Sequence, residues 1–303
     1  MRAYFFPNPL DARAIGAIVE EQKITHLLAT PTFLQSYARR ITPEQFGSLR
    51  FVLTGAEKLR SSLADEFERR FGIRPVEAYG ATETSPAVSV STRNVREPGI
   101  FQVGFREGWI GHPIPGVAVR IADPETGALM PPNEPGMLLI KGPNVMLGYF
   151  NDPEKTAEVI RNGWYVSGDI AKMDTDGFIQ ITDRLSRFSK IGGEMVPHLK
   201  IEEALHEITE SIERIFAVTG VPDEKKGERL VVLYACATEM AKSAAEQLGS
   251  SGILPNLWIP KFSDFMKVDA IPILGTGKTD LRALKEIAME RTAGEREPKA
   301  QSK

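Results

Sequence analysis

Residues 164–196 of the chain read WYVSGDIAKMDTDGFIQITDRLSRFSKIGGEMV, and turn-forming residues separate short apolar runs throughout this stretch. We expect Ser167–Asp169 to form a tight turn that presents its carboxylate, and Asp174–Gly177 to reverse the chain. A strand-like run follows, then the charged corner Asp183–Ser186 and a second glycine-rich loop at Ile191–Gly193. Loops held between strands in this way are typical of ligand-binding segments. An ordinary pair of hairpins is the structural alternative.

The composition is that of a globular protein and does not indicate a nucleic-acid-binding surface. The chain has 303 residues, of which 42% are hydrophobic and 25% charged, and its formal net charge is −3. This length allows a full core and predicts two domains, while the slight acidity argues against a nucleic-acid partner. The one cysteine, Cys236, lies in an apolar run, so we expect a buried, inert thiol and a reducing cytosol.

The sequence shows neither a membrane-spanning nor a zinc-binding pattern. Its apolar runs are shorter than the roughly 18 residues that a membrane span needs, and the N-terminus lacks a signal-peptide pattern. The four histidines, at positions 26, 112, 198 and 206, are scattered without metal-ligand spacing. We therefore expect a cytoplasmic protein without a transmembrane segment, and any attachment to the inner membrane would be peripheral and through a partner.

Residues 10–80 alternate between helical and strand signals. Three short apolar strands separated by helices indicate βαβ units and therefore a parallel sheet. Ligands bind beyond the carboxyl ends of such strands, so the loops Thr54–Glu57 and Tyr79–Glu83 are the first candidates for a site. Because the first strand begins only near residue 25, we expect a partial sheet. The predicted helices cover residues 10–22, 31–40 and 60–72, and the predicted strands cover 25–30, 49–55 and 74–80.

The rest of the chain predicts a β-rich region and then a small α+β domain. From residue 85 to residue 163, glycine and proline break short strand-like runs every few residues, as in a β-barrel-like unit. One short helix begins there after Asp152, its predicted N-cap. After Arg184 the pattern becomes α+β, followed by a polar tail that we expect to be disordered. The expected fold class is thus α/β and α+β, with domains at 1–183 and 184–288 and a tail at 289–303.

The loop after the third predicted strand has residue types suited to a phosphate. In Tyr79–Thr84, the small residues Gly80 and Ala81 allow backbone N–H groups to approach a phosphate group. The Thr82 hydroxyl can bind a phosphate oxygen, and the Glu83 carboxylate can hold a hard cation such as Mg²⁺. A solvated corner between strand and loop is the structural alternative.

Gly55–Glu57 and Asp169 are further candidates for nucleotide contacts. The small residues Gly55 and Ala56, ahead of Glu57, would let a flat base lie on the backbone, with a plain strand–helix turn as the alternative. Asp169 can accept hydrogen bonds from both hydroxyls of a ribose, as acidic residues do in dinucleotide sites. Its alternative role is only to form a turn.

A run near the C-terminus presents one lysine, Lys278. Residues 271–279 read IPILGTGKT, which looks like the end of a phosphate-binding P-loop, but Pro272 stands where that motif needs glycine. The P-loop interpretation is therefore rejected. A lysine on such a loop is still suited to neutralise charge in an acyl-phosphate transition state, with a solvated loop lysine as the alternative.

Taken in order, these motifs resemble those of the adenylate-forming superfamily of acyl-CoA synthetases, luciferases and peptide-synthetase adenylation domains. The resemblance extends from about residue 8 to residue 286. It implies a two-step reaction, in which a carboxylate and Mg-ATP give an acyl-adenylate and pyrophosphate before a phosphopantetheine thiol attacks the acyl carbon. The matching runs are Gly55–Glu57, Tyr79–Glu83, Tyr165–Asp169, Asp183–Arg184 with Gly192–Glu194, and Gly275–Lys278.

The resemblance implies roles for the matching residues of the N-terminal region. Gly55–Glu57 would face the adenine of ATP or AMP, and the backbone of Tyr79–Ala81 would approach the phosphates. Thr82 would contact phosphate directly. Glu83 would bind Mg²⁺.

The resemblance implies further roles for residues after position 164. Asp169 and Arg184 would bind the ribose. Lys278 would contact the reacting carboxylate and the bridging oxygen, delivered by a mobile C-terminal domain. The loop with Gly192 and Gly193 would line the path of the thiol, which belongs to coenzyme A or to an acyl carrier protein.

A finer resemblance concerns residues 185–198, LSRFSKIGGEMVPH, and residues 27–39, LLATPTFLQSYAR. Both runs are similar to the synthetase part of bacterial acyl-[acyl-carrier-protein] synthetase/2-acylglycerophosphoethanolamine acyltransferase proteins. This resemblance implies a fatty acid substrate. At the hinge, Ser186 stands where many relatives carry Asp or Lys.

The superfamily's phosphate loop ending in Pro-Lys-Gly has no counterpart in the 78 residues before Tyr79, and the acyltransferase motif His-x4-Asp is also missing. We therefore expect a truncated adenylate-forming enzyme that would need an upstream-encoded N-terminal half, or an acyltransferase, as its partner. Loss of the phosphate loop should cripple adenylation, because triphosphate positioning supplies much of the catalysis. Two alternatives are a plain acyl-CoA ligase and a non-catalytic remnant or complementing subunit that binds AMP or acyl-adenylate.

Overall fold

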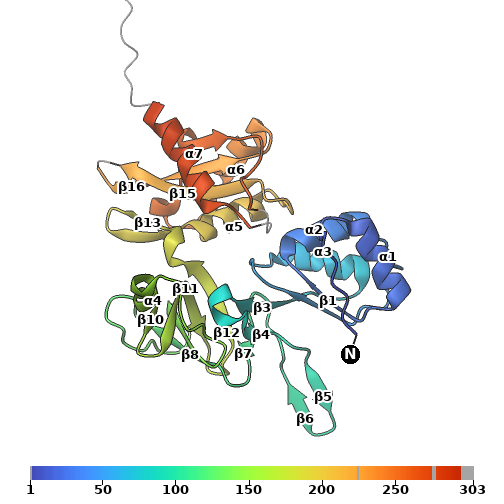
Figure 1. The fold of residues 1–303 in the computed structure, drawn as a ribbon. Coiled ribbons are helices and arrows are strands. Elements are labelled where there is room, and N and C mark those ends of the chain that lie inside the picture. The colour runs from blue at the N-terminus through green and yellow to red at the C-terminus, as the bar shows by residue number, and fades with distance from the viewer. Residues whose placement is uncertain (1, 224, 275–277, 295–303) are drawn as a thin grey trace, which may run out of the picture. The chain divides into compact units, whose positions relative to one another are not determined.

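The computed structural model describes residues 2–223, 225–274 and 278–294 of the chain. These residues form two compact units, Met1–Thr182 and Asp183–Lys303. The strand β12 (Ile179–Arg184) carries the chain from the first unit to the second. Figure 1 shows the elements of each unit.

The first unit contains the predicted parallel sheet. β1 pairs with β2 and β2 with β3, both in parallel, so the predicted βαβ arrangement is confirmed. β4 and β7 extend the sheet on the far side of β3 with antiparallel pairing. The strands are β1 (His26–Ala29), β2 (Phe51–Thr54), β3 (Val76–Gly80), β4 (Ala87–Val90) and β7 (His112–Pro113).

Helix caps visible in the sequence define the helices beside this sheet. The Asp11 carboxylate accepts from the Ala14 N–H at 3.0 Å, and Thr30 caps a helix whose first residue is Pro31. Gly72 ends a third helix in the left-handed conformation, with φ 70°. These helices bury one apolar stripe each in a common core with β1 and β2. They are α1 (Ala12–Gln22), α2 (Pro31–Arg40) and α3 (Ser61–Phe71).

The predicted β-rich region forms a second sheet in the order β10-β11-β9-β8, with β12 pairing with β11. Its core includes Val88 from β4, so the two sheets of this unit share packing. Asp152 caps the short helix α4 (Pro153–Val159), as expected. The strands are β8 (Ala118–Ala122), β9 (Gly136–Lys141), β10 (Ile160–Arg161) and β11 (Trp164–Met173).

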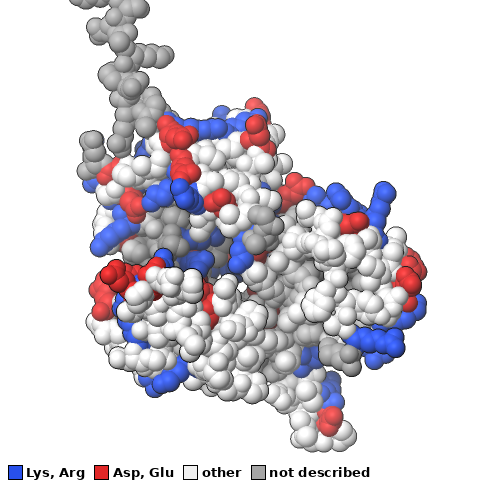
Figure 2. Space-filling view, in the orientation of Figure 1, with Lys and Arg blue, Asp and Glu red and all other residues white. Residues whose placement is uncertain are grey.

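A separate two-stranded hairpin, β5 (Val95–Glu97) and β6 (Ile100–Gln102), projects from the first unit (Figure 1). Phe101 on this hairpin is 62% exposed. Figure 2 shows that basic and acidic side chains are mixed on this face of the molecule, with much uncharged surface over the first unit.

The second unit is a sheet covered by helices on both faces. Alternate residues of β15 and β16 enter two separate cores: Phe216 and Val232 pack with α5 and α6, whereas Ala217 and Val231 pack with α7. The predicted α+β pattern is therefore confirmed. The strands are β13 (Phe188–Ile191), β14 (Glu194–Pro197), β15 (Phe216–Asp223), β16 (Gly227–Tyr234) and β17 (Phe265–Lys267), and the helices are α5 (His198–Ile208), α6 (Thr238–Ser251) and α7 (Leu281–Gly294).

Two expectations for the second unit need correction. Residues 289–294 were expected to begin a disordered tail, but they belong to α7, because Ala288 and Thr292 both lie buried along it. The remainder of that tail, 295–303, lies outside the described residues. Cys236 is half-buried rather than buried, and burial raises the pKa of its thiol. Among the helices in the described part of the chain, none combines the length and the apolar character needed to cross a bilayer.

Candidate functional site

The loop after β3 is fixed by its own hydrogen bonds. The 3-10 turn η1 (Thr82–Thr84) follows Gly80 and Ala81 directly. The buried Thr84 hydroxyl accepts from the Ala81 N–H at 3.0 Å and lies within donating distance, 3.0 Å, of the Pro86 carbonyl oxygen. Within this fixed turn, the Thr82 side chain is exposed and Glu83 is half-buried. Both side chains can therefore meet a ligand.

The Gly55–Glu57 loop leaves the carboxyl end of β2 beside this turn. Thr54 pairs with Glu77 across the parallel strands, and a Cβ added at Gly55 would lie 3.4 Å from the Ala78 carbonyl oxygen. Ala56 adopts a left-handed backbone, with φ 72°, which is uncommon for a residue other than glycine. The two predicted loops therefore emerge side by side from neighbouring strands.

Asp169 lies in a bulge of β11 rather than in the expected tight turn. β11 contributes Ser167, Gly168 and Asp169 where β9 contributes only Leu138, so the two strands stay paired on either side. The Ser167 hydroxyl donates to the Leu138 carbonyl at 2.8 Å and accepts from the Asp169 N–H at 3.1 Å. Gly168 is left-handed, with φ 76°. A left-handed glycine such as Gly168 can occupy either a tight turn or a bulge, which explains the wrong prediction.

A hydrogen bond joins this bulge to the end of β3. The Tyr79 hydroxyl donates to Oδ2 of Asp169. Burial raises the pKa of Tyr79 well above its ordinary range, and the charge of the neighbouring Asp169 carboxylate adds to the effect. The phenol therefore remains a proton donor, and the two predicted nucleotide segments meet at this contact.

Two residues of the candidate site were not predicted from the sequence. The Tyr149 hydroxyl donates to Oε1 of Glu83 at 2.8 Å, and the Asn144 amide nitrogen donates to the Thr84 carbonyl at 3.1 Å. Both residues belong to the loop between β9 and α4, more than 50 residues from η1 in sequence. No local pattern marks such a contact, so only the fold could reveal it.

The other predicted site residues belong to the second unit. Arg184 ends β12, and Gly192 and Gly193 form a two-residue hairpin between β13 and β14, with φ values of 59° and 94°. Lys278 is exposed, and its carbonyl accepts from the Leu274 N–H at 2.7 Å. Residues 275–277 of the Gly-Thr-Gly-Lys run lie outside the described residues. The roles of these residues stay predictions.

The second unit begins with a buried carboxylate, Asp183, which is 2% exposed. Its Oδ1 accepts from the Arg184 N–H at 2.7 Å, whereas Oδ2 is buried and accepts no hydrogen bond from the described residues. Burial raises the pKa of Asp183 to about 7, against the opposing effects of the Arg184 N–H and the Arg187 charge. Arg187 itself is paired with Glu202 of α5.

Asp183→Asn is expected to stabilise the protein at pH 8 by about 1–3 kcal/mol, since it removes a buried charge that lacks a full set of partners. The folded pKa of about 7 exceeds the ordinary value of 3.8, so Asp183 makes stability fall as pH rises between these values. The variant should lack this decline and match the parent near pH 4. Urea unfolding at pH 4, 6 and 8 measures the difference in unfolding free energy between variant and parent. A difference that stays constant across that range would show that Asp183 does not cause the pH dependence. His198, whose pKa is lowered by burial to about 3, is common to both proteins and cancels.

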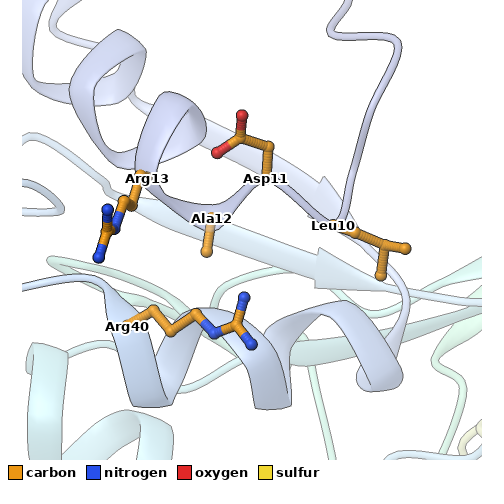
Figure 3. Close-up of a pocket in the computed structure, with 5 residues that line it drawn as sticks. All are labelled: Leu10, Asp11, Ala12, Arg13 and Arg40. Atoms are coloured by element: carbon orange, nitrogen blue, oxygen red, sulfur yellow. The ribbon is translucent and has the colours of Figure 1, made fainter.

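One cavity lies apart from these residues. It has a volume of about 350 Å³ and is lined by Leu10, Asp11, Ala12, Arg13 and Arg40 at the start of α1 and the end of α2 (Figure 3). None of the predicted site residues lines it. In the described part of the chain, no group of three or more His, Cys, Asp or Glu side chains could by itself hold a metal ion.

Comparison with known proteins agrees with the motifs. Residues 1–150 match the family described as AMP-binding enzyme. The chain is 35% identical over 276 residues to a feruloyl-CoA synthase of Amycolatopsis sp, in an alignment that covers 89% of this chain and 53% of that protein. The chain belongs to the AMP-binding enzyme family. A second relative, a long-chain-fatty-acid–CoA ligase of Bacillus subtilis (strain 168), is 34% identical over 278 residues, covering 90% of this chain and 47% of that protein.

The fold of the chain also matches solved structures. The structure of ATP-bound MatB from Rhodopseudomonas palustris aligns with a TM-score of 0.77 and 27% identity, covering 93% of this chain and 54% of that one. The expected adenylate-forming fold class is therefore confirmed. The chain spans about half the length of the curated relatives it matches.

Proposed function

We propose that this chain is the nucleotide-binding part of an ATP-dependent acid–thiol ligase. The reaction forms an acyl-adenylate from a carboxylic acid and ATP, and then transfers the acyl group to a phosphopantetheine thiol. The hydrogen bond between Tyr79 and Asp169 carries this proposal. It ties the end of β3, next to the residues suited to phosphate, to the bulge that carries Asp169, and Gly55–Glu57 follows the neighbouring strand β2.

In this proposal, the chain binds AMP through two neighbouring loops and the bulge. The backbone of Gly55–Glu57 faces the adenine, and Thr82 with the small residues Gly80 and Ala81 contacts the phosphate. Asp169 accepts from the ribose hydroxyls. Two hydrogen bonds support its orientation. The Ser167 hydroxyl accepts from the Asp169 backbone N–H, and the Tyr79 hydroxyl donates to the Asp169 carboxylate.

Glu83 fits the role of a Mg²⁺ ligand. Mg²⁺ is usually held by one or two carboxylates together with substrate phosphates, so a single protein carboxylate beside a phosphate-binding loop is sufficient. When bound, the ion neutralises charge on the phosphates. Glu83 meets this requirement because it is half-buried in η1, next to Thr82.

The second unit supplies the remaining proposed roles. Lys278 stabilises negative charge on the reacting carboxylate and the bridging oxygen, and Arg184 binds the ribose. The hairpin at Gly192–Gly193 lines the path of the thiol. Its left-handed glycines have no neighbouring atom within 4 Å of a would-be Cβ, so the backbone there is open to a ligand.

We propose a fatty acid as the carboxylate and an acyl carrier protein as the thiol carrier. The similarity of residues 185–198 and 27–39 to acyl-carrier-protein synthetases supports this choice. The fatty-acid–CoA ligase of Bacillus subtilis among the relatives supports the acid and favours coenzyme A as the competing acceptor. Transfer assays with the carrier protein and with coenzyme A, run side by side, separate the two acceptors.

The proposed activity is tested by ATP–pyrophosphate exchange with a long-chain fatty acid, using this chain alone and with an upstream-encoded N-terminal half. Exchange that depends on the fatty acid is expected, and Glu83→Gln should reduce it strongly. Glu97→Gln, on the exposed hairpin strand β5, is the matched control and should have no effect. Absence of exchange in both preparations would refute catalysis by this chain.

A second candidate function is binding of AMP or acyl-adenylate without turnover, as a non-catalytic remnant or as a complementing subunit. This function stays a candidate because the chain spans only about half of the relatives' length. AMP binding in equilibrium dialysis, without any exchange, is the result that would select it.

A further inference from the structure

The loop between β9 and α4 holds Glu83 at two points. The Met146 N–H donates to the Glu83 backbone carbonyl at 2.8 Å, and the Tyr149 hydroxyl donates to the side-chain oxygen Oε1 at 2.8 Å. The same loop also fixes the end of the turn, because the Asn144 amide donates to the carbonyls of Thr84 and Ala87 at 3.1 and 2.7 Å. Both the backbone and the carboxylate of Glu83 are thus oriented from outside η1.

The first turn of α4 in turn fixes Tyr149. The Tyr149 N–H donates to the Thr156 hydroxyl at 2.8 Å, and that hydroxyl donates to the Asp152 carbonyl at 2.8 Å. The Lys155 ammonium lies 6.0 Å from the centre of the Tyr149 ring. The backbone of Tyr149 is therefore tied to the first turn of α4, the helix that Asp152 caps.

The Tyr149 hydroxyl holds one of the two carboxylate oxygens of Glu83. It donates to Oε1 at 2.8 Å, which leaves Oε2 available to a cation.

We propose that Tyr149 is a positioning residue for the metal ligand Glu83, acting through the hydrogen bond to Oε1. This inference rests on the proposed function, in which Glu83 binds the cation of the metal–nucleotide complex. Residues that hydrogen-bond a metal-binding carboxylate fix its orientation, and their loss typically weakens metal binding by about 10- to 100-fold. Asn144 and Met146 serve the same turn through its backbone.

The test is Tyr149→Phe, which removes one hydroxyl and keeps the ring. Mn²⁺ replaces Mg²⁺ as the probe, and electron paramagnetic resonance measures free Mn²⁺ during titration of the ATP-saturated protein. Mn²⁺ affinity should fall about tenfold, while the affinity for AMP without metal and the melting temperature stay unchanged. Tyr4→Phe is the matched control, because it removes an exposed hydroxyl that donates to Gln22, and it should change nothing.

A double variant shows whether Tyr149 acts through Glu83. If it does, Tyr149→Phe adds no further loss of Mn²⁺ affinity in the Glu83→Gln protein. Equal losses in both backgrounds, or a parallel loss of metal-free AMP affinity and melting temperature, would overturn the positioning role.

The failures of the two proposals are distinguishable. A loss of Mn²⁺ affinity in Glu83→Gln with none in Tyr149→Phe contradicts this inference alone. An unchanged affinity in Glu83→Gln contradicts the metal role in the proposed function, and the inference with it.

Discussion

Lys278→Ala should slow acyl-adenylate formation by about 10²–10³-fold, the loss typical when a preorganised group that stabilises developing charge is removed. AMP affinity should change little, because the proposed contact is with the reacting carboxylate and the bridging oxygen. The fold should tolerate the change. The Lys278 side chain is exposed, and Ile273 pairs with Thr279 on either side of the loop.

Single-turnover formation of acyl-adenylate, in a complemented enzyme if the chain alone is inactive, measures this effect. AMP binding is determined on the same protein by equilibrium dialysis. Lys225→Ala removes another exposed lysine of the second unit and serves as the control. Equal losses of adenylation and AMP binding would refute the assigned role of Lys278.

Gly80→Ala should lower the free energy of unfolding of the first unit by about 3 kcal/mol or more. A Cβ at this position would lie 1.7 Å from the Pro86 carbonyl oxygen and 2.7 Å from its carbonyl carbon. The obstacle is backbone in both cases, so no flexible side chain can move aside. Relief requires β3 and β4 to separate, which would also displace the Thr84 hydroxyl from Pro86.

Urea unfolding measures the loss, and Gly249→Ala is the control. Gly249 lies exposed in α6, and a Cβ there would have no neighbour within 4 Å. Alanine should therefore stabilise α6 by about 0.5–1 kcal/mol. Similar stabilities for both variants would contradict this prediction. They would mean that β3 and β4 separate easily at Gly80, although Tyr79 pairs with Ser89 next to it.

The sequence predicted the elements whose signals are local. The predicted N-cap Asp152 begins α4, and the helices predicted at residues 10–22, 31–40 and 60–72 correspond to α1, α2 and α3. The short apolar runs at β1, β2 and β3 were correctly assigned to a parallel sheet, because helical segments separate them. The loops at Gly55 and Tyr79 followed from this topology alone.

The wrong predictions concern segments whose residue types fit two different local structures. The glycine of Ser167-Gly168-Asp169 fits a turn or a bulge, and only the pairing of β11 with β9 decides between them. The polar residues after 288 suggested disorder. Instead, α7 continues to Gly294 and buries Thr292. Tyr149 carries no local signal, because its partner Glu83 lies 66 residues away.

The bulge of β11 implies a trade-off between stability and function. Removing two residues would restore an unbroken ladder to β9, and a regular ladder pairs more backbone groups. The shortened strand would nevertheless lose the geometry that turns Asp169 toward Tyr79. Selection for stability alone would therefore tend to erase this bulge, and its presence is expected only while a carboxylate is needed there.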